Sequence, residues 1–268
     1  MKYNEQTQMW ESKYWHPAVT TDAVVVGFDG EELKILLIQR GIEPFKGMWA
    51  LPGGFMDKDD ANATEAVKRE LREETSVTDI FLEQFSTFSD AARDPRERVI
   101  TIAFFAIVDP KAYRIIGGDD ASDARWFAVN NLPELAFDHS EIIRTALTRM
   151  RERLHTEPIG FRLVGEEFTM PQLQKTYAQI DQSACNFEMC TKSSEEPSHK
   201  LDLPNFEKPR RGLTKWIHDR RNFSKKMLSK DYVKDTGRTL GGNPNRSPHI
   251  YRFDEEEYYR AEGSDDDQ

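Results

Sequence analysis

Apolar residues in the first half of the chain gather in short runs of strand length. Such runs occupy residues 19–28, 34–39, 79–88 and 98–107, with shorter ones at 49–51 and 124–127. The turn Asp29-Gly30-Glu31-Glu32 separates the first two runs. Residues 63–75 instead repeat their apolar positions at the three- and four-residue spacing of a helix. Strands gathered around one amphipathic helix predict a mixed α/β domain.

The second half begins with a helix and continues with smaller elements. Asp138 and Glu141 form a capping-box-like helix start. The helix has one apolar face, made of Ile142, Ile143, Ala146, Leu147, Met150 and Leu154. A short helix is predicted to begin within residues 167–171, with Thr169 as its cap and Leu173 and Tyr177 directed inward.

Residues 183–207 are polar and rich in proline and serine, which predicts an inserted or disordered loop. A second helix, at roughly 218–229, precedes a glycine-rich segment and a strand at 250–253. Helix, basic helix, glycine-rich hairpin and aromatic strand is the order of a winged helix-turn-helix.

The predicted helix at 63–75 carries carboxylates on its apolar face. On a helical wheel Glu70 and Glu74 fall among the apolar residues, and Glu73 lies at their edge. Burying an unpaired carboxylate is costly, so three carboxylates at i, i+3 and i+4 are expected to face a cation. Oxygen ligands suit Mg²⁺ or Mn²⁺. The alternative is an ordinary amphipathic helix whose glutamates pair with Arg69, Arg72 and bases elsewhere.

Pro52-Gly53-Gly54 ends a strand-like run shortly before this helix. Glycines in such a place permit a tight turn and a close approach of the backbone to a ligand. Strand, glycine turn and acid-lined helix together predict a platform for a metal ion and a pyrophosphate.

Gly54, followed by Arg69-Glu70-Leu71-x-Glu73-Glu74-x-Ser76-Val77, resembles the Nudix box, Gx5Ex7REUxEExGU with U aliphatic. The resemblance implies that Glu70, Glu73 and Glu74 bind the metal ion and act in catalysis together with Arg69, which braces them. Two features depart from the pattern. Ser76 replaces the usual glycine, and one residue too many separates Gly54 from Arg69, which leaves the first glutamate of the box without a direct counterpart. The candidates for that position are Asp59, Asp60 and Glu65.

The run RGIEPFKGMWALPGGF, which leads into the box, is similar to that of ADP-ribose-directed Nudix proteins and their regulator relatives. This resemblance implies that Arg40, Gly53, Gly54 and Phe55 bind the substrate. The charged loop at 90–98 supplies Asp94 and Glu97 as candidates for an auxiliary acid or base, and an ordinary solvated loop is the alternative.

Composition narrows the class of protein. The 268 residues suffice for one large domain or two modest ones, and 38% apolar with 31% charged residues indicate a soluble protein. No signal peptide is expected, because the N-terminus MKYNEQTQMWESKYW is polar and aromatic and contains no apolar run. No membrane partner is expected, because no apolar stretch approaches the ~18 residues that span a bilayer. Cys185 and Cys190 provide no disulfide framework, which favours a cytoplasmic location. Their spacing, with His199 beyond, allows the alternative of a zinc fragment, which is not favoured because a fourth ligand is missing and the segment looks unstructured.

A net charge of −10 argues against a protein that coats nucleic acid indiscriminately. The charge is unevenly distributed, however: residues 208–238 hold eleven Lys and Arg against three acids, and residues 254–267 hold eight acids and one Arg. The residues expected to contact DNA lie in this basic segment, except for one that follows it: Arg220, Arg221, Asn222, Ser224, Lys225, Lys226 and Arg238 in the segment, and Arg246 beyond it. The alternative is a positively charged solvent face on a helical tail.

The runs EFTMPQLQKTY and DRRNFSKKML, with a glycine-rich segment ending in HIYRF, resemble the C-terminal half of Nudix-related transcriptional regulators of the NrtR type. The resemblance covers most of residues 18–253 and implies a Nudix α/β/α sandwich with a mixed sheet, followed by a winged helix-turn-helix domain. It departs at an insert of about 183–214, where relatives have a short turn. Double-stranded DNA is the expected partner, and a homodimer is expected because helix-turn-helix proteins commonly work as dimers.

These patterns divide the chain into an N-terminal extension at 1–17, a Nudix domain at 18–138 and a bridging helix at 139–157. A winged-helix-like domain at 158–254, with its flexible insert, and an acidic disordered tail at 255–268 complete it. The segments allow a hydrolase that splits a nucleoside diphosphate linked to another moiety, such as ADP-ribose. They also allow a catalytically silent regulator of NAD or sugar metabolism that only senses such a ligand. Because Arg69 and all three glutamates of the box are present, we predict an Mg²⁺-dependent hydrolase that also binds DNA and regulates transcription.

Overall fold

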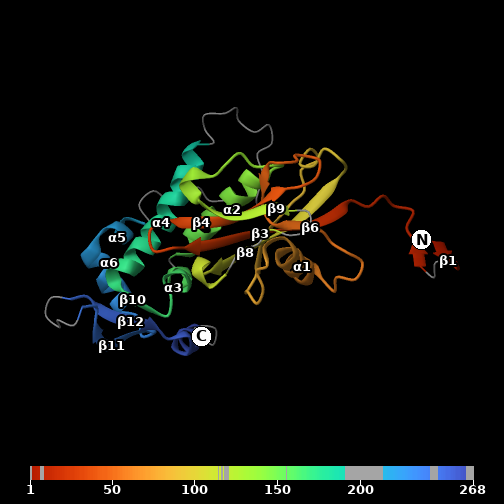
Figure 1. Ribbon diagram of the computed structural model, residues 1–268. Helices are drawn as coiled ribbons and strands as arrows, with labels where there is room; N and C mark the ends of the chain where they lie inside the picture. The colour runs from red at the N-terminus through yellow and green to blue at the C-terminus, as the bar shows by residue number, and fades with distance from the viewer. Residues whose placement is uncertain are drawn as a thin grey trace.

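The structure is a computed structural model that describes residues 2–263, except 7, 8, 114, 116, 118–120, 155, 191–213 and 242–246. A large sheet with helices on both faces is followed by a smaller unit of helices and strands (Figure 1). The large sheet contains β3 (Ala18–Phe28), β4 (Leu33–Arg40), β5 (Trp49–Ala50), β6 (Gly53–Phe55), β7 (Glu83–Phe88), β8 (Val99–Val108) and β9 (Ala121–Ala128). Its helices are α1 (Ala63–Thr75) and α2 (His139–Arg153), with 3-10 turns at Pro110–Ala112 and Val129–Asn131.

The seven-stranded sheet is mixed, as the sequence predicts. Its main path runs β5-β4-β3-β8-β7, with β6 paired to β3 and β9 paired to β4. The two longest strands, β3 and β8, run parallel from the pair Ala18 and Val99 to the pair Gly27 and Val108. The remaining pairs in this sheet are antiparallel.

Strand β3 is buried on both of its faces, which explains its near-continuous run of valines. Ala23 and Val25 belong to the apolar cluster that includes Val67 of α1. Val24 and Val26 belong to a second, larger cluster that includes α2. The sheet is therefore the middle layer of an α/β/α sandwich.

The second unit has the element order of a winged helix. Its elements are α3 (Ile159–Val164), β10 (Glu167–Thr169), α4 (Met170–Cys190), α5 (Lys215–His218), α6 (Arg220–Leu228), β11 (Val233–Thr239) and β12 (His249–Phe253). The strands form a small antiparallel sheet in the order β10-β12-β11. Helix α4 lies between the sandwich on one side and α5 and α6 on the other (Figure 1).

The two units share one apolar core. Leu173, Tyr177 and Ile180 of α4 belong to the same buried cluster as Ile143 and Leu147 of α2. At the surface, Lys175 Nζ of α4 donates a hydrogen bond to Gly30 O in the β3–β4 turn, at 2.9 Å. These contacts fix the position of α4 relative to the large sheet.

Helix α4 is longer than the short helix predicted at this place. Thr169 caps it as expected, because Gln172 N–H donates to Thr169 Oγ1 at 3.4 Å and Thr169 N–H donates to Gln172 Oε1 at 2.8 Å. The helix then continues for 21 residues because Ile180 and Ala184 extend its buried face. The loop expected from residue 183 therefore does not begin before residue 191, and residues 191–213 of the expected insert lie outside the described residues.

Two further expectations are corrected. Residues 79–82 are not part of a strand, and β7 begins at Glu83. The capping box at the start of α2 does not form, because the Asp138 carboxylate accepts hydrogen bonds from Arg93 and makes no side-chain cap bond.

The expected disordered tail contains α7 (Glu255–Gly263), while residues 264–268 lie outside the described part of the chain. Tyr258 anchors α7, since its ring lies 5.2 Å from that of Tyr232 and 5.8 Å from that of Phe253. At the other end of the chain, β1 (Lys2–Asn4) and β2 (Met9–Glu11) pair as a hairpin that projects away from the sandwich (Figure 1). None of the helices in the described part of the chain combines the length and apolar character that crossing a membrane requires.

Candidate active site

The glycine turn at the end of β6 brings the backbone against α1. Gly53 has a φ of 152°, and a Cβ there would lie 2.1 Å from Thr21 O. A Cβ on Gly54 would lie 2.6 Å from Glu70 Oε1. Only glycine fits both positions without displacing a neighbour, so the turn and the carboxylate helix are packed in direct contact.

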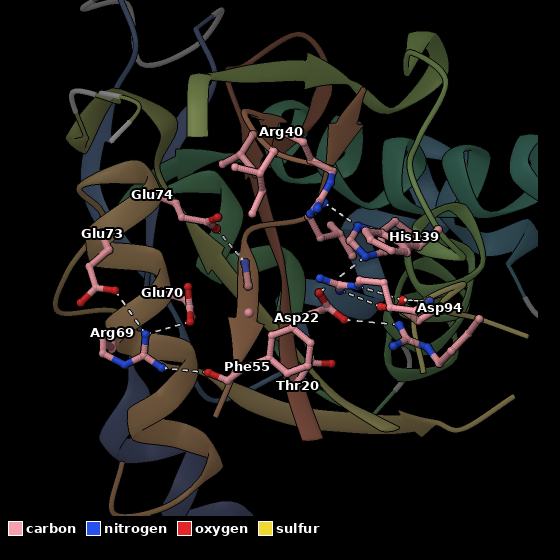
Figure 2. A pocket seen from close by; sticks show the side chains of 18 residues that line it. Thr20, Asp22, Arg40, Phe55, Arg69, Glu70, Glu73, Glu74, Asp94 and His139 are labelled. Carbon is pink, nitrogen blue, oxygen red and sulfur yellow. Dashed lines mark hydrogen bonds and ion pairs between the residues drawn. The ribbon is translucent and has the colours of Figure 1, made fainter. Parts of the chain in front are cut away.

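Helix α1 carries Glu70, Glu73 and Glu74 to one wall of a cavity of about 380 Å³. Figure 2 shows these side chains on one side of the cavity, with Asp22, Asp94 and His139 on the other. Gly53, Gly54, Phe55 and Arg40, the expected substrate-binding residues, also line it. The structure thus brings all the residues expected for metal and substrate together in one place.

Arg69 and Glu74 set the charge of this wall. Arg69 Nη1 donates to Glu70 Oε1 at 2.8 Å and to Glu73 Oε2 at 3.2 Å, while Gly53 N–H donates to Glu74 Oε2 at 2.9 Å. Burial raises the pKa of Glu70, although Arg69 opposes the shift. Burial, together with the nearby charges of Glu70 and Asp22, raises the pKa of Glu74 to about 8, against the opposing hydrogen bond from Gly53. Glu74 is therefore protonated at neutral pH when no cation is bound.

The donor set fits a hard divalent cation in its chemistry. Glu70, Glu73 and Glu74 provide carboxylate oxygens on consecutive turns of one helix, which is what Mg²⁺ and Mn²⁺ prefer. The raised pKa of Glu74 indicates a carboxylate that a cation would stabilise in its charged form. Among the described residues, no three acidic, His or Cys side chains converge on one point. Arg69 binds the carboxylates of Glu70 and Glu73, whereas Glu74 accepts its hydrogen bond from Gly53.

The opposite wall is built on a buried carboxylate in the middle of β3. Thr101 Oγ1 donates to Asp22 Oδ2 at 2.6 Å, and Arg93 Nη2 lies 3.6 Å from the same oxygen. Arg93 also donates to both carboxylate oxygens of Asp138, at 2.9 and 2.8 Å. Asp22, Arg93 and the start of α2 therefore form one connected wall.

His139 belongs to this wall as a neutral imidazole. Leu51 N–H donates to its Nδ1 at 2.8 Å, and full burial lowers the pKa of His139. The ring proton consequently resides on Nε2, which lies 3.6 Å from Asp22 Oδ1.

One end of the cavity is aromatic and cationic. The Arg96 guanidinium carbon lies 5.1 Å from the Phe55 ring centre and 5.8 Å from that of Phe137, and the guanidinium carbon of Arg40 lies 4.8 Å from the Phe137 ring centre. Phe55 is 40% exposed, so the cavity is open on this side. Asp94 holds Arg96 in place through bonds of 3.0 and 2.8 Å.

The loop at 90–98 reaches the cavity with one of its two candidate acids, Asp94. Burial favours a raised pKa for Asp94, yet hydrogen bonds from the Arg96 side chain and backbone outweigh it and lower the pKa. Asp94 thus binds Arg96 as a carboxylate, which makes it a weak base. Glu97 is exposed and is not among the residues that line the cavity. The loop also contributes Arg93 and Arg96 to the cavity.

In the winged helix, the expected DNA contacts gather on α6 and in the wing. The exposed ones are Arg220, Arg221, Asn222, Lys225 and Arg238, while Ser224 and Lys226 are half-buried. Lys226 Nζ lies 4.0 Å above the Trp216 ring, and Arg238 pairs with Glu167 of β10. Arg246 lies outside the described residues, as does His199 of the zinc fragment.

Comparisons with known proteins cover both units. The NUDIX domain model matches residues 16–146. The chain is 34% identical over 176 residues, 65% of this chain and 70% of the relative, to the ADPR responsive transcriptional repressor NtrR of Acinetobacter baylyi. It is 44% identical over 131 residues, 49% of this chain and 73% of the relative, to the ADP-ribose pyrophosphatase of Methanocaldococcus jannaschii. The chain belongs to the Nudix family.

A solved structure extends the likeness to the winged helix. Shewanella oneidensis NrtR complexed with a 27mer DNA covers 90% of this chain over 95% of its own length, with a TM-score of 0.61 and 26% identity. The fold is therefore the Nudix α/β/α sandwich with a mixed sheet, followed by a winged helix-turn-helix.

The segment with one residue too many, between Gly54 and Arg69, contains a carboxylate that contacts the arginine of the box. Arg69 donates to Asp60 from Nε at 3.1 Å and from Nη2 at 2.8 Å, and this pair lowers the pKa of Asp60. Of the other candidates, Glu65 pairs with Lys68 on the exposed side of α1, at 3.0 Å, and Asp59 is exposed. Asp60 is thus the residue that contacts the arginine of the box.

The second departure, Ser76, caps α1. Its φ of 60° places it in the left-handed region, where glycine is the usual helix-ending residue of the Nudix box, and its N–H donates to Arg72 O at 3.1 Å. The serine therefore ends the helix at the same point at a modest conformational cost.

Sequence reasoning missed Asp22, Arg93 and His139. Asp22 had a visible signal, because it is the single charged residue in the apolar run of β3. Arg93 and His139 had none, since their roles depend on partners 45 and 88 residues away along the chain.

Proposed function

We propose that this Nudix chain is an Mg²⁺-dependent hydrolase of ADP-ribose or a closely similar nucleoside diphosphate, and that its winged helix binds double-stranded DNA. The observation that carries the proposal is the wall formed by Glu70, Glu73, Glu74 and Arg69, which faces Arg40 and Arg96 across one cavity. Carboxylates on one side and arginines on the other suit a metal ion and a pyrophosphate together. The relatives support the choice of ligand, because one is named an ADP-ribose pyrophosphatase and the other an ADPR responsive repressor.

Different residues of the cavity have different roles in this proposal. Glu70, Glu73 and Glu74 would hold Mg²⁺ or Mn²⁺, which neutralises the charge of a bound pyrophosphate and lowers the pKa of an attacking water. Arg69 keeps the carboxylates of α1 oriented toward each other. The glycine turn lets the ligand approach the backbone at Gly54.

The other end of the cavity suits the remainder of the ligand. Phe55 and Phe137 offer ring faces beside Arg96, and Arg40 provides a further positive charge for phosphate oxygens. Thr20 Oγ1 lines the cavity, is buried, and has no hydrogen-bond partner among the described residues. A polar ligand group would satisfy it.

A hydrolysis assay tests the enzymatic part. With Mg²⁺, the wild-type chain should release AMP from ADP-ribose, and Glu73→Gln should lower the rate on the order of 100-fold or more. Glu65→Gln is the matched control, since Glu65 lies on the exposed side of the same helix and should leave the rate unchanged. A wild-type protein that releases no AMP with either Mg²⁺ or Mn²⁺ refutes hydrolysis. If calorimetry nevertheless shows ADP-ribose binding, the alternative of a catalytically silent sensor replaces it.

The DNA-binding part rests on the exposed basic residues of α6 and on the likeness to the NrtR–DNA structure. Arg221→Ala/Lys225→Ala should weaken binding to duplex DNA and reduce the slope of log affinity against log salt by about 2, roughly one for each lost phosphate contact. Lys68→Ala/Lys111→Ala removes two exposed lysines from the sandwich and serves as the charge-matched control. An unchanged affinity and slope in the α6 variant would rule out this surface.

The proposal also covers the oligomeric state, the domain boundaries and the cellular compartment. We propose a homodimer, because two winged helices reading adjacent half-sites gain affinity and specificity. We also propose that residues 18–138 form the catalytic unit and residues 158–254 the DNA-binding unit, joined by the bridging segment at 139–157. The protein would act in the cytoplasm, where nucleoside diphosphates and DNA are both present. Sedimentation at several concentrations tests the dimer.

A further inference from the structure

Helix α2 begins in the wall of the cavity. Its first residue, His139, accepts a hydrogen bond from Leu51 N–H, and the preceding residue, Asp138, is held by two hydrogen bonds from Arg93. The Arg93 side chain is only 4% exposed. A change in the position of Arg93 or His139 is therefore a change at the start of α2.

The other end of α2 is fixed to the winged helix through one carboxylate. Arg151 Nε, near the end of α2, donates to Asp181 Oδ1 of α4 at 2.7 Å. His218 Nε2 of α5 lies 3.0 Å from Asp181 Oδ2. The Asp181 side chain is 6% exposed and that of Arg151 16%, whereas the His218 side chain is 44% exposed, so only the contact with Arg151 is largely shielded from solvent.

His218 is directly followed by the residue that starts α6. Asp219 caps this helix, because its carboxylate accepts a hydrogen bond from Asn222 N–H at 2.8 Å. A second bond fastens the same segment to α4, where Gln174 Nε2 donates to Ile217 O at 2.7 Å. Asp181 therefore contacts the residue that directly precedes the cap of the basic helix α6.

Between its two ends α2 is packed as a rigid body. Its inward residues have no exposed surface: Ile142, Ile143, Ala146, Leu147 and Met150. A close-packed helix of 15 residues, about 22 Å long, shifts as a unit rather than deforming along its length. Small displacements at one end consequently reach the other end.

We propose that Asp181 is a positioning residue that couples ligand binding in the cavity to the position of α6, with α2 as the connecting element. This coupling rests on the proposed function. An anionic ligand competes with Asp138 and Asp22 for Arg93, so the ligand-bound and ligand-free forms hold α2 differently. Arg151 carries that difference to Asp181, and His218 carries it on to the start of α6. Because coupling is reciprocal, DNA bound to α6 changes the affinity of the cavity for its ligand by the same factor.

Hydrogen exchange of the full chain tests the coupling and requires no DNA of defined sequence. ADP-ribose is added in EDTA, so that metal-dependent hydrolysis does not take place, and exchange is followed in the loop at 90–98 and in α5 and α6. In the wild-type protein we expect slower exchange in the loop and an exchange rate in α5–α6 that changes by about 5-fold or more, the lower end of typical allosteric coupling.

Variants at the far end of α2 separate positioning from mere stabilisation. In Asp181→Asn and in His218→Ala the ligand should still protect the loop, but the change in α5–α6 should disappear. His218 is 44% exposed in its side chain, so its replacement leaves the core intact if Asp181→Asn fails to fold. Glu152→Gln, which removes an exposed ion pair of 3.5 Å with Arg149 on the same helix, should behave as the wild type.

The outcomes distinguish a failure of the proposed function from a failure of the coupling. If ADP-ribose leaves the loop at 90–98 unchanged, the ligand assignment of the proposed function fails, and the coupling fails with it. Protection of the loop without any change in α5–α6 overturns the coupling alone. So does a ligand response in α5–α6 that persists in both Asp181→Asn and His218→Ala, because Asp181 would then serve only the stability of the fold.

Discussion

Replacing Glu74 by Gln should stabilise the metal-free protein, and the gain should grow with pH. The folded protein raises the pKa of Glu74 from 4.5 to about 8, so this group binds a proton more tightly in the folded than in the unfolded state. Stability from this group is therefore fully present below pH 4.5 and is lost as the pH rises toward 8. Glutamine has the shape of the protonated acid, and its carbonyl oxygen can still accept the Gly53 N–H bond.

The size of the effect follows from linkage. The wild-type protein should lose about 1 kcal/mol at pH 5 and about 3 kcal/mol at pH 7 relative to a form that never ionises at this position. Because the Glu74 side chain is buried, screening by solvent reduces these values little. Set against a typical domain stability of 5–15 kcal/mol, roughly a third of the total is at stake.

Urea denaturation in EDTA at several pH values measures the difference. The midpoint of Glu74→Gln should move to higher urea than that of the wild type as the pH increases from 5 to 8, with an unchanged slope. The exposed control Glu65→Gln should show no such trend. A difference between Glu74→Gln and wild type that stays constant across this range would refute the reasoning, because the carboxyl would then not titrate differently in the folded state. Adding Mg²⁺ should reverse the order, since only the wild type retains the third carboxylate.

Two further predictions concern the box. Gly54→Ala should lower Mg²⁺-dependent hydrolysis of ADP-ribose more than tenfold while costing about 1–3 kcal/mol of stability, because its methyl group would lie 2.6 Å from Glu70 Oε1; an unchanged rate would contradict this close contact. Asp60→Asn should weaken the hydrogen bonds between this side chain and Arg69, and should lower the hydrolysis rate about 10- to 100-fold, as for other residues that orient metal ligands. The exposed control Asp59→Asn should leave the rate unchanged. Equal rates in the two variants would show that Asp60 does not help to position Arg69.

The box itself could be predicted in detail from the sequence, because its geometry is local. Glu70, Glu73 and Glu74 share a face through helical spacing alone, and α1 begins and ends at the predicted residues. The winged helix was likewise evident in the order of its elements. Predictions were weaker where a local signal had two outcomes: Asp138 has the sequence of a helix cap, but Arg93 takes its carboxylate.

Local patterns along the chain were enough to predict the periodic strands, the carboxylate helix, the glycine turn and the basic helix α6, because each depends on residues a few positions apart. Tertiary packing was needed to place Asp60 against Arg69, to bring Asp22 and His139 into the cavity, and to join Arg151 to His218 through Asp181. The reason is physical. Such contacts depend on which distant segments the packed sheet and helices bring within hydrogen-bonding distance, and that information is not contained in the spacing of residues along one segment.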